Sequence, residues 1–312
     1  SPHRPAVSDP SPTAQGAGVA DWAYRPPQAG HWDEAFDSAG RPRRHWTRLA
    51  AALQRMGYQE FTRRWDEGQR LIRANGVTYN VYSDPRGSAR PWPMDLIPLA
   101  IAGAEWREIE RAVIQRATLL NAILKDLYGP MALVRDGSIP PELVFGNPGF
   151  LRACHGIRPP ADVYLQNYAV DLARAPNGAW WVLTDRTQSP SGSGYALENR
   201  LVSMRTLPAV LEHCRVQPLH EFFATTINAL FALAPHRPSN PRVVVLTAGP
   251  NSETYFEHSF FARQWGFPLV VGEDLTVRKS RVFLKTLAGL NAVDIILRRV
   301  DDDFCDPLEL RG

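Results

Sequence analysis

Lysine is scarce in this 312-residue chain, with only Lys125, Lys279 and Lys285 among its 35 basic residues. The other basic residues are arginines, scattered among acidic residues and prolines without any run of about five or six like charges. Because phosphate-tracking surfaces need such clusters, the net charge of +3 does not predict binding to nucleic acid.

Cysteine is also scarce, and long apolar runs are missing. Cys154, Cys214 and Cys305 lie far apart without a Cys-x-x-Cys pair, which argues against a disulfide framework or a zinc site and favours a reducing compartment. No stretch approaches the roughly 18 consecutive apolar residues that a membrane span requires. We therefore expect a cytoplasmic protein whose partners include neither a membrane nor nucleic acid.

Two long helices are predicted in the first half of the chain. Residues 1–30 lack the apolar segment of a secretory signal and are predicted to form a disordered extension. Apolar residues at three- and four-residue spacing then predict helices over 48–73 and 104–128, the second of which ends at Gly129-Pro130.

A β-hairpin is predicted next, and polar residues gather where it meets the following helix. Its strands are "DVYLQNYAVDLAR" and "AWWVLTD", and Asn177-Gly178 between them is the strongest short hairpin signal. Because Asp171 and Asp185 belong to paired strands, we expect both carboxylates near one end of the ribbon, with the amide of Gln188 close by. Carboxylate and amide oxygens suit Mg²⁺, whose coordination nucleotide phosphates usually complete.

The segment after the hairpin, residues 190–194 ("PSGSG"), is predicted to expose backbone N–H groups at a helix start. Phosphates and carboxylates bind at such positions. The plainer alternative for the whole region is a pair of solvated acids at strand ends and a serine that caps a helix.

The pattern changes after the proline-rich segment 236–242, where strand, turn and helix begin to alternate. That alternation predicts a βαβ unit of a parallel sheet. We therefore expect a mixed α+β and α/β protein, with a first module over residues 31–238 and a parallel-sheet domain over residues 241–312. The second domain is too short to be complete, so we expect the chain to be a fragment truncated at its C-terminus.

Several ordered motifs resemble one protein family. They include "NGVTYNVY", "RPWPMDLIP", "LLNAILKDLYGP", "FGNPGF", "RTQSPSGSGYALENR" and "RRVDDDFCDPLELR". Residues 31–312 look like the circularly permuted type 2 ATP-grasp proteins, relatives of the glutathionylspermidine synthetase group and of D-alanine–D-alanine ligase. The resemblance implies a metal- and substrate-binding module before an incomplete Rossmann-like pre-ATP-grasp domain, with the lid over ATP after residue 312.

The resemblance carries over unevenly to the metal site. Asp171 matches the first metal-binding aspartate, but Thr184 and Arg186 stand where a glutamate and an asparagine are expected. Three alternatives stay open: Asp185 and Gln188 complete the metal site, or Arg186 replaces a cation and binds phosphate directly, or the site is degenerate.

The resemblance also implies further site residues. The candidates for catalysis or anion binding are Arg186, Ser191, Gly192, Ser193 and Arg200. The candidates for substrate binding are Glu253, Arg298, Arg299, Asp301 and Asp302. Each has a plainer explanation as a helix cap, a first-turn acid or a solvated ion pair.

The function that this resemblance implies is an ATP- and Mg²⁺-dependent carboxylate–amine (or thiol) ligase that acts through an acyl phosphate. Its substrate would be a small or peptide-like molecule with a carboxylate and an amine, and a protein partner or a fused C-terminal domain is a further option. Catalysis would come mainly from positioning and charge neutralisation. Without the lid the fragment is expected to be inactive. The competing function is a degenerate ATP-grasp fold that serves as a binding or scaffold module.

Overall fold

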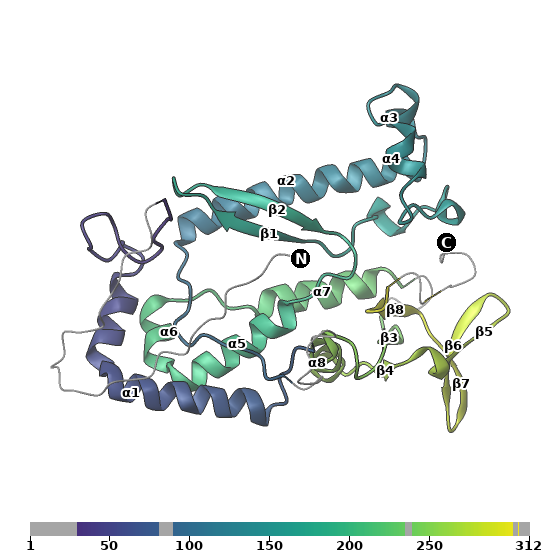
Figure 1. Cartoon of the computed structure of the whole chain (residues 1–312). Helices are drawn as coiled ribbons and strands as arrows, with labels where there is room; N and C mark the ends of the chain where they lie inside the picture. Colours follow the sequence, from purple (N-terminus) through teal and green to yellow (C-terminus); the bar gives the residue numbers. More distant parts are fainter. Residues whose placement is uncertain (1–29, 81–89, 235–238, 302–304, 306–312) are drawn as a thin grey trace, which may run out of the picture.

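The structure is a computed structural model that describes residues 30–80, 90–234, 239–301 and 305 (Figure 1). Most of the predicted N-terminal extension, part of the 236–242 segment and Asp302 lie outside the described residues.

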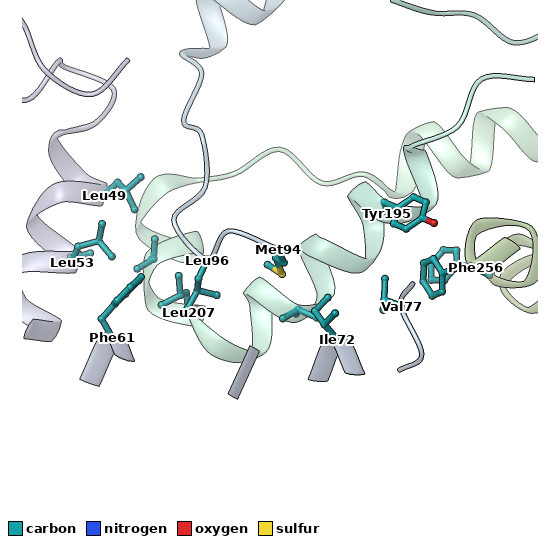
Figure 2. Packing of buried hydrophobic residues seen from close by; sticks show 14 of the residues in the cluster. Leu49, Leu53, Phe61, Ile72, Val77, Met94, Leu96, Tyr195, Leu207 and Phe256 are labelled. Atoms are coloured by element: carbon teal, nitrogen blue, oxygen red, sulfur yellow. The ribbon is translucent and has the colours of Figure 1, made fainter. Parts of the chain in front are cut away.

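The first predicted helix is confirmed as α1 (Thr47–Ala74), and its apolar side chains contribute to the main core. Gly57 interrupts α1 with a left-handed φ of 73°, so the helix kinks there. α5 (Ser193–Thr206) and α6 (Pro208–Cys214) pack against α1. Figure 2 shows the buried cluster that joins these helices to α8 (Tyr255–Trp265), including Leu49, Leu53, Phe61, Ile72, Val77, Met94, Leu96, Tyr195, Leu207 and Phe256.

The second predicted helix is α2 (Gly103–Leu127), and the predicted hairpin lies along it as β1 (Ala169–Arg174) and β2 (Trp180–Arg186) (Figure 1). Both predictions are confirmed. Polar contacts tie hairpin to helix: Glu105 of α2 binds the Arg174 guanidinium and accepts a hydrogen bond from the Trp180 indole N–H (3.0 Å).

The parallel strands predicted after residue 241 are also confirmed. β3 (Val243–Leu246) lies between β4 (Leu269–Val270) and β8 (Ile295–Arg298), and both neighbours run parallel to it. α8 connects β3 to β4. Three parallel strands in the described residues make less than a doubly wound domain, so the Rossmann-like assignment stays a prediction.

The remaining described elements are a small antiparallel sheet, three further helices and three 3₁₀ turns. An antiparallel sheet is inserted before β8, with strands β5 (Leu275–Arg278), β6 (Arg281–Thr286) and β7 (Gly289–Ala292). The other helices are α3 (Ala132–Arg135), α4 (Pro141–Phe145), α7 (His220–Ala232) and the 3₁₀ turns Arg152–Cys154, Pro160–Asp162 and Gly272–Asp274. Among the described helices, none combines the length and apolar character needed to cross a bilayer.

Candidate functional site

The loop that follows β2 is held against the carboxyl ends of the parallel strands. Ser189 Oγ donates to the carbonyl oxygen of Arg298 (3.0 Å), and Arg299 Nη1 donates to the carbonyl oxygen of Pro190 (2.8 Å). Arg298 is the last residue of β8, and it pairs with the last residue of β3. Open α/β sheets bind their ligands at this edge. We refer to the meeting of residues 187–194 with this edge as the junction.

Two backbone N–H groups of the 190–194 loop, which were predicted to bind a substrate anion, donate to the carboxylate of Glu257 instead. Gly192 N–H donates to both oxygens of Glu257 (2.9 and 3.0 Å), and Gly194 N–H donates to Oε1 (2.7 Å). Ser193 Oγ lies 3.4 Å from the same oxygen. Glu257 is fully buried on α8 and also contacts Arg299. Glu257 therefore occupies this helix N-terminus, and the predicted role of Gly192 and Ser193 in holding a substrate carboxylate or acyl phosphate stays a prediction. Ser191 is exposed beside it.

The two aspartates predicted to share a metal lie on opposite faces of the hairpin. Asp171 pairs with Thr184, whereas Asp185 pairs with Val170. Neighbouring residues of a strand point to opposite faces, so the register separates the two carboxylates.

Asp185 faces α2 and is bound there. Its two oxygens accept from Nε and Nη2 of Arg116 (2.6 and 2.7 Å), and Oδ1 also accepts from the Tyr168 hydroxyl (2.5 Å). The Arg116 fork, with help from Tyr168, lowers the pKa of Asp185 to about 2. Burial, reinforced by the Asp185 carboxylate, raises the pKa of Tyr168 to about 12. Asp185 thus fastens the hairpin to the helix.

Asp171 is bound by Arg186 on the other face. Oδ2 of Asp171 accepts from both Nε (3.0 Å) and Nη2 (2.8 Å) of Arg186, and both side chains are about half exposed. A β-bulge interrupts the register between Asp171 and Leu172, and bulges often re-aim side chains beside active sites.

These contacts do not fit a divalent cation shared by Asp171, Asp185 and Gln188. The two carboxylates point away from each other, and each already faces an arginine. No cluster of three acidic, histidine or cysteine side chains with metal-ligating geometry occurs in the part of the chain that the structure describes. Mg²⁺ needs several converging oxygens. Of the three alternatives, the metal completed by Asp185 and Gln188 does not fit this geometry, and both a phosphate-binding Arg186 and a degenerate site stay predictions.

Glu253 lies in the loop between β3 and α8, which leaves the same edge of the sheet, and it contacts two residues that the sequence did not single out. The Tyr79 hydroxyl is 3.5 Å from Glu253 Oε2, and Asn80 N–H donates to the Glu253 carbonyl (3.0 Å). Burial, together with Glu253, raises the pKa of Tyr79, and Arg186 is near enough to oppose that rise. Tyr79 and Asn80 belong to the "NGVTYNVY" motif, and this motif was the feature of the sequence that could have pointed to them as site residues.

Two other predicted site residues, Arg200 and Asp301, make no described contact with the 187–194 loop. Arg200 Nη1 donates to the Gln217 carbonyl (2.7 Å) and so supports the segment before α7. Asp301 is exposed two residues beyond Arg299. The structure therefore gathers Ser191–Ser193, Arg298 and Arg299 at the junction, with Glu253 in the loop that leaves the same sheet edge, but it leaves Asp185 and Arg200 outside.

Comparison with known proteins assigns this architecture to a family. The sequence profile described as circularly permuted ATP-grasp type 2 matches residues 98–312, which contain the hairpin, the loop and the parallel strands. The chain belongs to this family. That membership confirms the resemblance seen in the sequence motifs.

Similar proteins extend the comparison. The uncharacterized protein sll0335 of Synechocystis sp. is 42% identical over 279 residues, which cover 88% of this chain and 57% of that protein. The uncharacterized protein Rv2567 of Mycobacterium tuberculosis is 40% identical over 294 residues, or 92% of this chain and 33% of that protein. The chain thus spans between about a third and three fifths of the length of these relatives.

Proposed function

We propose that this chain forms the carboxylate- and phosphate-binding part of an ATP-dependent carboxylate–amine (or thiol) ligase. The observation that carries the proposal is the junction: the loop after the Asp171–Arg186 pair is fixed at the carboxyl edge of the parallel sheet, the edge from which the loop with Glu253 also leaves. The proposal sets a cation, an acid and an exposed serine loop around one edge, and membership in a family of ATP-grasp proteins supports it.

The proposed reaction has two steps. A substrate carboxylate oxygen attacks the γ-phosphorus of ATP, which gives an acyl phosphate and ADP. The nitrogen of an amine then attacks the acyl carbon, so that an amide bond forms while the bond to phosphate breaks and a proton is released. Such chemistry depends mainly on positioning and on stabilising negative charge.

Arg186 would bind the transferred phosphoryl group. Its guanidinium is permanently charged and about half exposed, and a planar fork of donors matches phosphate oxygens. Asp171 orients this fork through two hydrogen bonds to one carboxylate oxygen, and within the described part of the chain the remaining guanidinium N–H groups are left for a ligand.

Glu253 would receive the amine substrate. A carboxylate attracts an ammonium group, and the Tyr79 hydroxyl 3.5 Å from Oε2 restricts its position. Glu253 lies two residues before α8, in the loop that follows β3. That loop leaves the carboxyl edge of the sheet, where the 187–194 loop is also held. The substrate class that follows is a small or peptide-like pair of a carboxylate and an amine.

A second candidate function is a binding module without turnover. It is favoured by Glu257, which already fills the N-terminus of α5, and by the two aspartates, each of which is ion-paired with an arginine. Such a module would keep the fold, and any nucleotide that it bound would remain intact.

Trapping with hydroxylamine, on a protein extended past residue 312 to include the expected lid, distinguishes the two functions. Hydroxylamine reacts with an acyl phosphate to give a hydroxamate, so a ligase should form ATP-dependent hydroxamate from the correct member of a carboxylic acid panel, with matching ADP release. Arg186→Ala should abolish the signal, whereas Arg278→Ala, an exposed arginine on β5, should preserve it. ATP binding without hydroxamate or ADP across the panel would favour the binding module.

A further inference from the structure

A basic hollow lies on the molecule away from the junction. It has a volume of about 430 Å³, and its walls come from the first half of α1 and the end of α6. Figure 1 shows α6 beside α1 at the opposite end of the molecule from β3 and β8. The lining residues are Thr47, Arg48, Ala51, Arg55, Glu212, His213 and Arg215.

The charge in the hollow is not balanced. Three arginines face a single acid, Glu212, and the described residues form no ion pair with Arg55 or Arg215. Arg48 is different, because its Nη1 donates to the His213 carbonyl (3.1 Å) and is therefore fixed in place. Two exposed guanidinium groups thus stand beside a third that is already oriented.

The arrangement of these cations follows from the helix geometry. Arg48, Ala51 and Arg55 are spaced three and four residues apart, so they share one face of α1, with the small Ala51 between the two long side chains. Arg215 ends α6 with a left-handed φ of 49°, a conformation that costs energy for a residue with a side chain.

The frame around the hollow is rigid. Leu49 and Leu53 of α1 and Leu207 and Val210 beside or within α6 are buried in the main core. The hollow is therefore formed before a ligand arrives, and binding would not require ordering of the backbone.

The structure assigns this hollow as a binding site for a compact multivalent phosphate-type anion. Arginine forks match phosphate oxygens in pairs, and several such groups around one cavity favour a ligand with two or more negative charges. Among the described residues, no phenylalanine, tyrosine or tryptophan lines the hollow, so no large aromatic surface is offered for stacking a nucleotide base. The volume exceeds a single phosphate ion and suits pyrophosphate or a small phosphate ester.

The test measures binding of three probes to the full chain by calorimetry: inorganic phosphate, pyrophosphate and glycerol 3-phosphate, at ionic strength matched with sodium chloride. The probe that binds with the highest affinity shows whether the site prefers free phosphate, pyrophosphate or a phosphate ester. The double variant Arg55→Ala/Arg215→Ala is expected to weaken binding about tenfold or more. Ala51→Leu should weaken it as well, because it fills the hollow without changing any charge.

Two controls separate this site from general attraction and from the junction. Arg70→Ala removes another exposed charge from α1, outside the hollow, and should preserve binding. The double variant is also compared with its parent in an Arg186→Ala background, where the phosphate contact proposed at the junction is removed, and it should weaken binding there by the same factor, so failure of the ligase proposal does not affect this result. The inference is overturned if none of the three probes binds, if Arg70→Ala weakens binding as much as the double variant does, or if Ala51→Leu has no effect on a correctly folded chain.

Discussion

The Glu257 carboxylate and the Arg299 guanidinium meet in the interior, with Arg299 Nη2 3.4 Å from Glu257 Oε2. The side chain of Arg299 is 3% exposed and that of Glu257 is 0% exposed. Burial lowers the pKa of Arg299, and the Glu257 charge opposes this change. Because Glu257 also binds Gly192 and Gly194 while Arg299 binds Pro190, this one pair fixes the 190–194 loop onto α8 and the residue after β8.

Glu257→Gln should destabilise the protein strongly, because it leaves the Arg299 charge buried without its counterion. Removing one partner of a buried pair costs about 3–5 kcal/mol. Urea unfolding measures the effect, and Glu221→Gln, an exposed acid on α7, serves as the control with a change within about 0.5 kcal/mol. The double variant Glu257→Gln/Arg299→Met should recover part of the loss. A loss below about 1 kcal/mol in Glu257→Gln would contradict the role given to the pair.

Gly194→Ala should also destabilise the junction. A Cβ at Gly194 would lie 2.8 Å from Glu257 Cγ and 3.4 Å from Phe260 Cδ1, in a buried site. Overpacking of this kind costs about 1–3 kcal/mol. Thermal unfolding should show a lowered midpoint, whereas Gly272→Ala, which meets nothing within 4 Å, should leave it nearly unchanged. Equal midpoints for the two variants would argue against close packing at Gly194.

His258 should make the protein less stable as the pH falls. Its ring is buried between the hydroxyls of Thr247 (2.8 Å) and Thr254 (3.0 Å), and burial, with a contribution from Arg299, lowers its pKa to about 4. The unfolded chain, with a histidine pKa near 6.5, binds this proton more readily, so stability falls from about pH 6.5 to pH 4. The loss from this group approaches about 3 kcal/mol.

Denaturation curves across this range for His258→Gln isolate the contribution, because the variant should lose much of the pH dependence. His220→Gln, an exposed histidine at the start of α7, should keep it. Parallel stability profiles for wild type and His258→Gln would show that other groups cause the change.

Asp185→Asn should loosen the hairpin from α2, because it weakens the contacts with Arg116 and Tyr168. Hydrogen exchange of β2 amides should speed up roughly twofold to fivefold, as expected for a partly exposed ion pair. Asp171→Asn removes a carboxylate from the other face of the same hairpin and should leave that exchange nearly unchanged. Equal effects of the two variants would contradict the separation of the faces.

The local parts of the fold were predictable from the sequence. Asn177-Gly178 between two apolar strands specifies a hairpin through its turn conformation, and the apolar spacing of residues 104–128 specifies a helix. Both signals depend on neighbouring residues only, so they do not require knowledge of the rest of the chain.

The side-chain partners were not predictable, for two physical reasons. A shift of one residue in strand register moves a side chain to the other face, and the sequence does not reveal the bulge at Asp171 or the pairing of Asp185 with Val170. The contact between Glu257 and Gly194 joins residues 63 positions apart, and nothing near either residue indicates it. The prediction of a metal shared by Asp171 and Asp185 assumed that paired strands bring their acids together, which the register prevents.

Calorimetric titration of ATP into the full chain, with Mg²⁺ present and absent, tests the role of Arg186 most directly. Arg186→Ala should weaken ATP binding about tenfold or more, since it removes a charged contact to phosphate. Asp185→Asn should bind ATP as the wild type does, because Asp185 faces α2. Binding that requires Mg²⁺ and is lost equally in Asp171→Ala and Asp185→Asn, with Arg186→Ala unaffected, would contradict this account and restore a metal held by both aspartates.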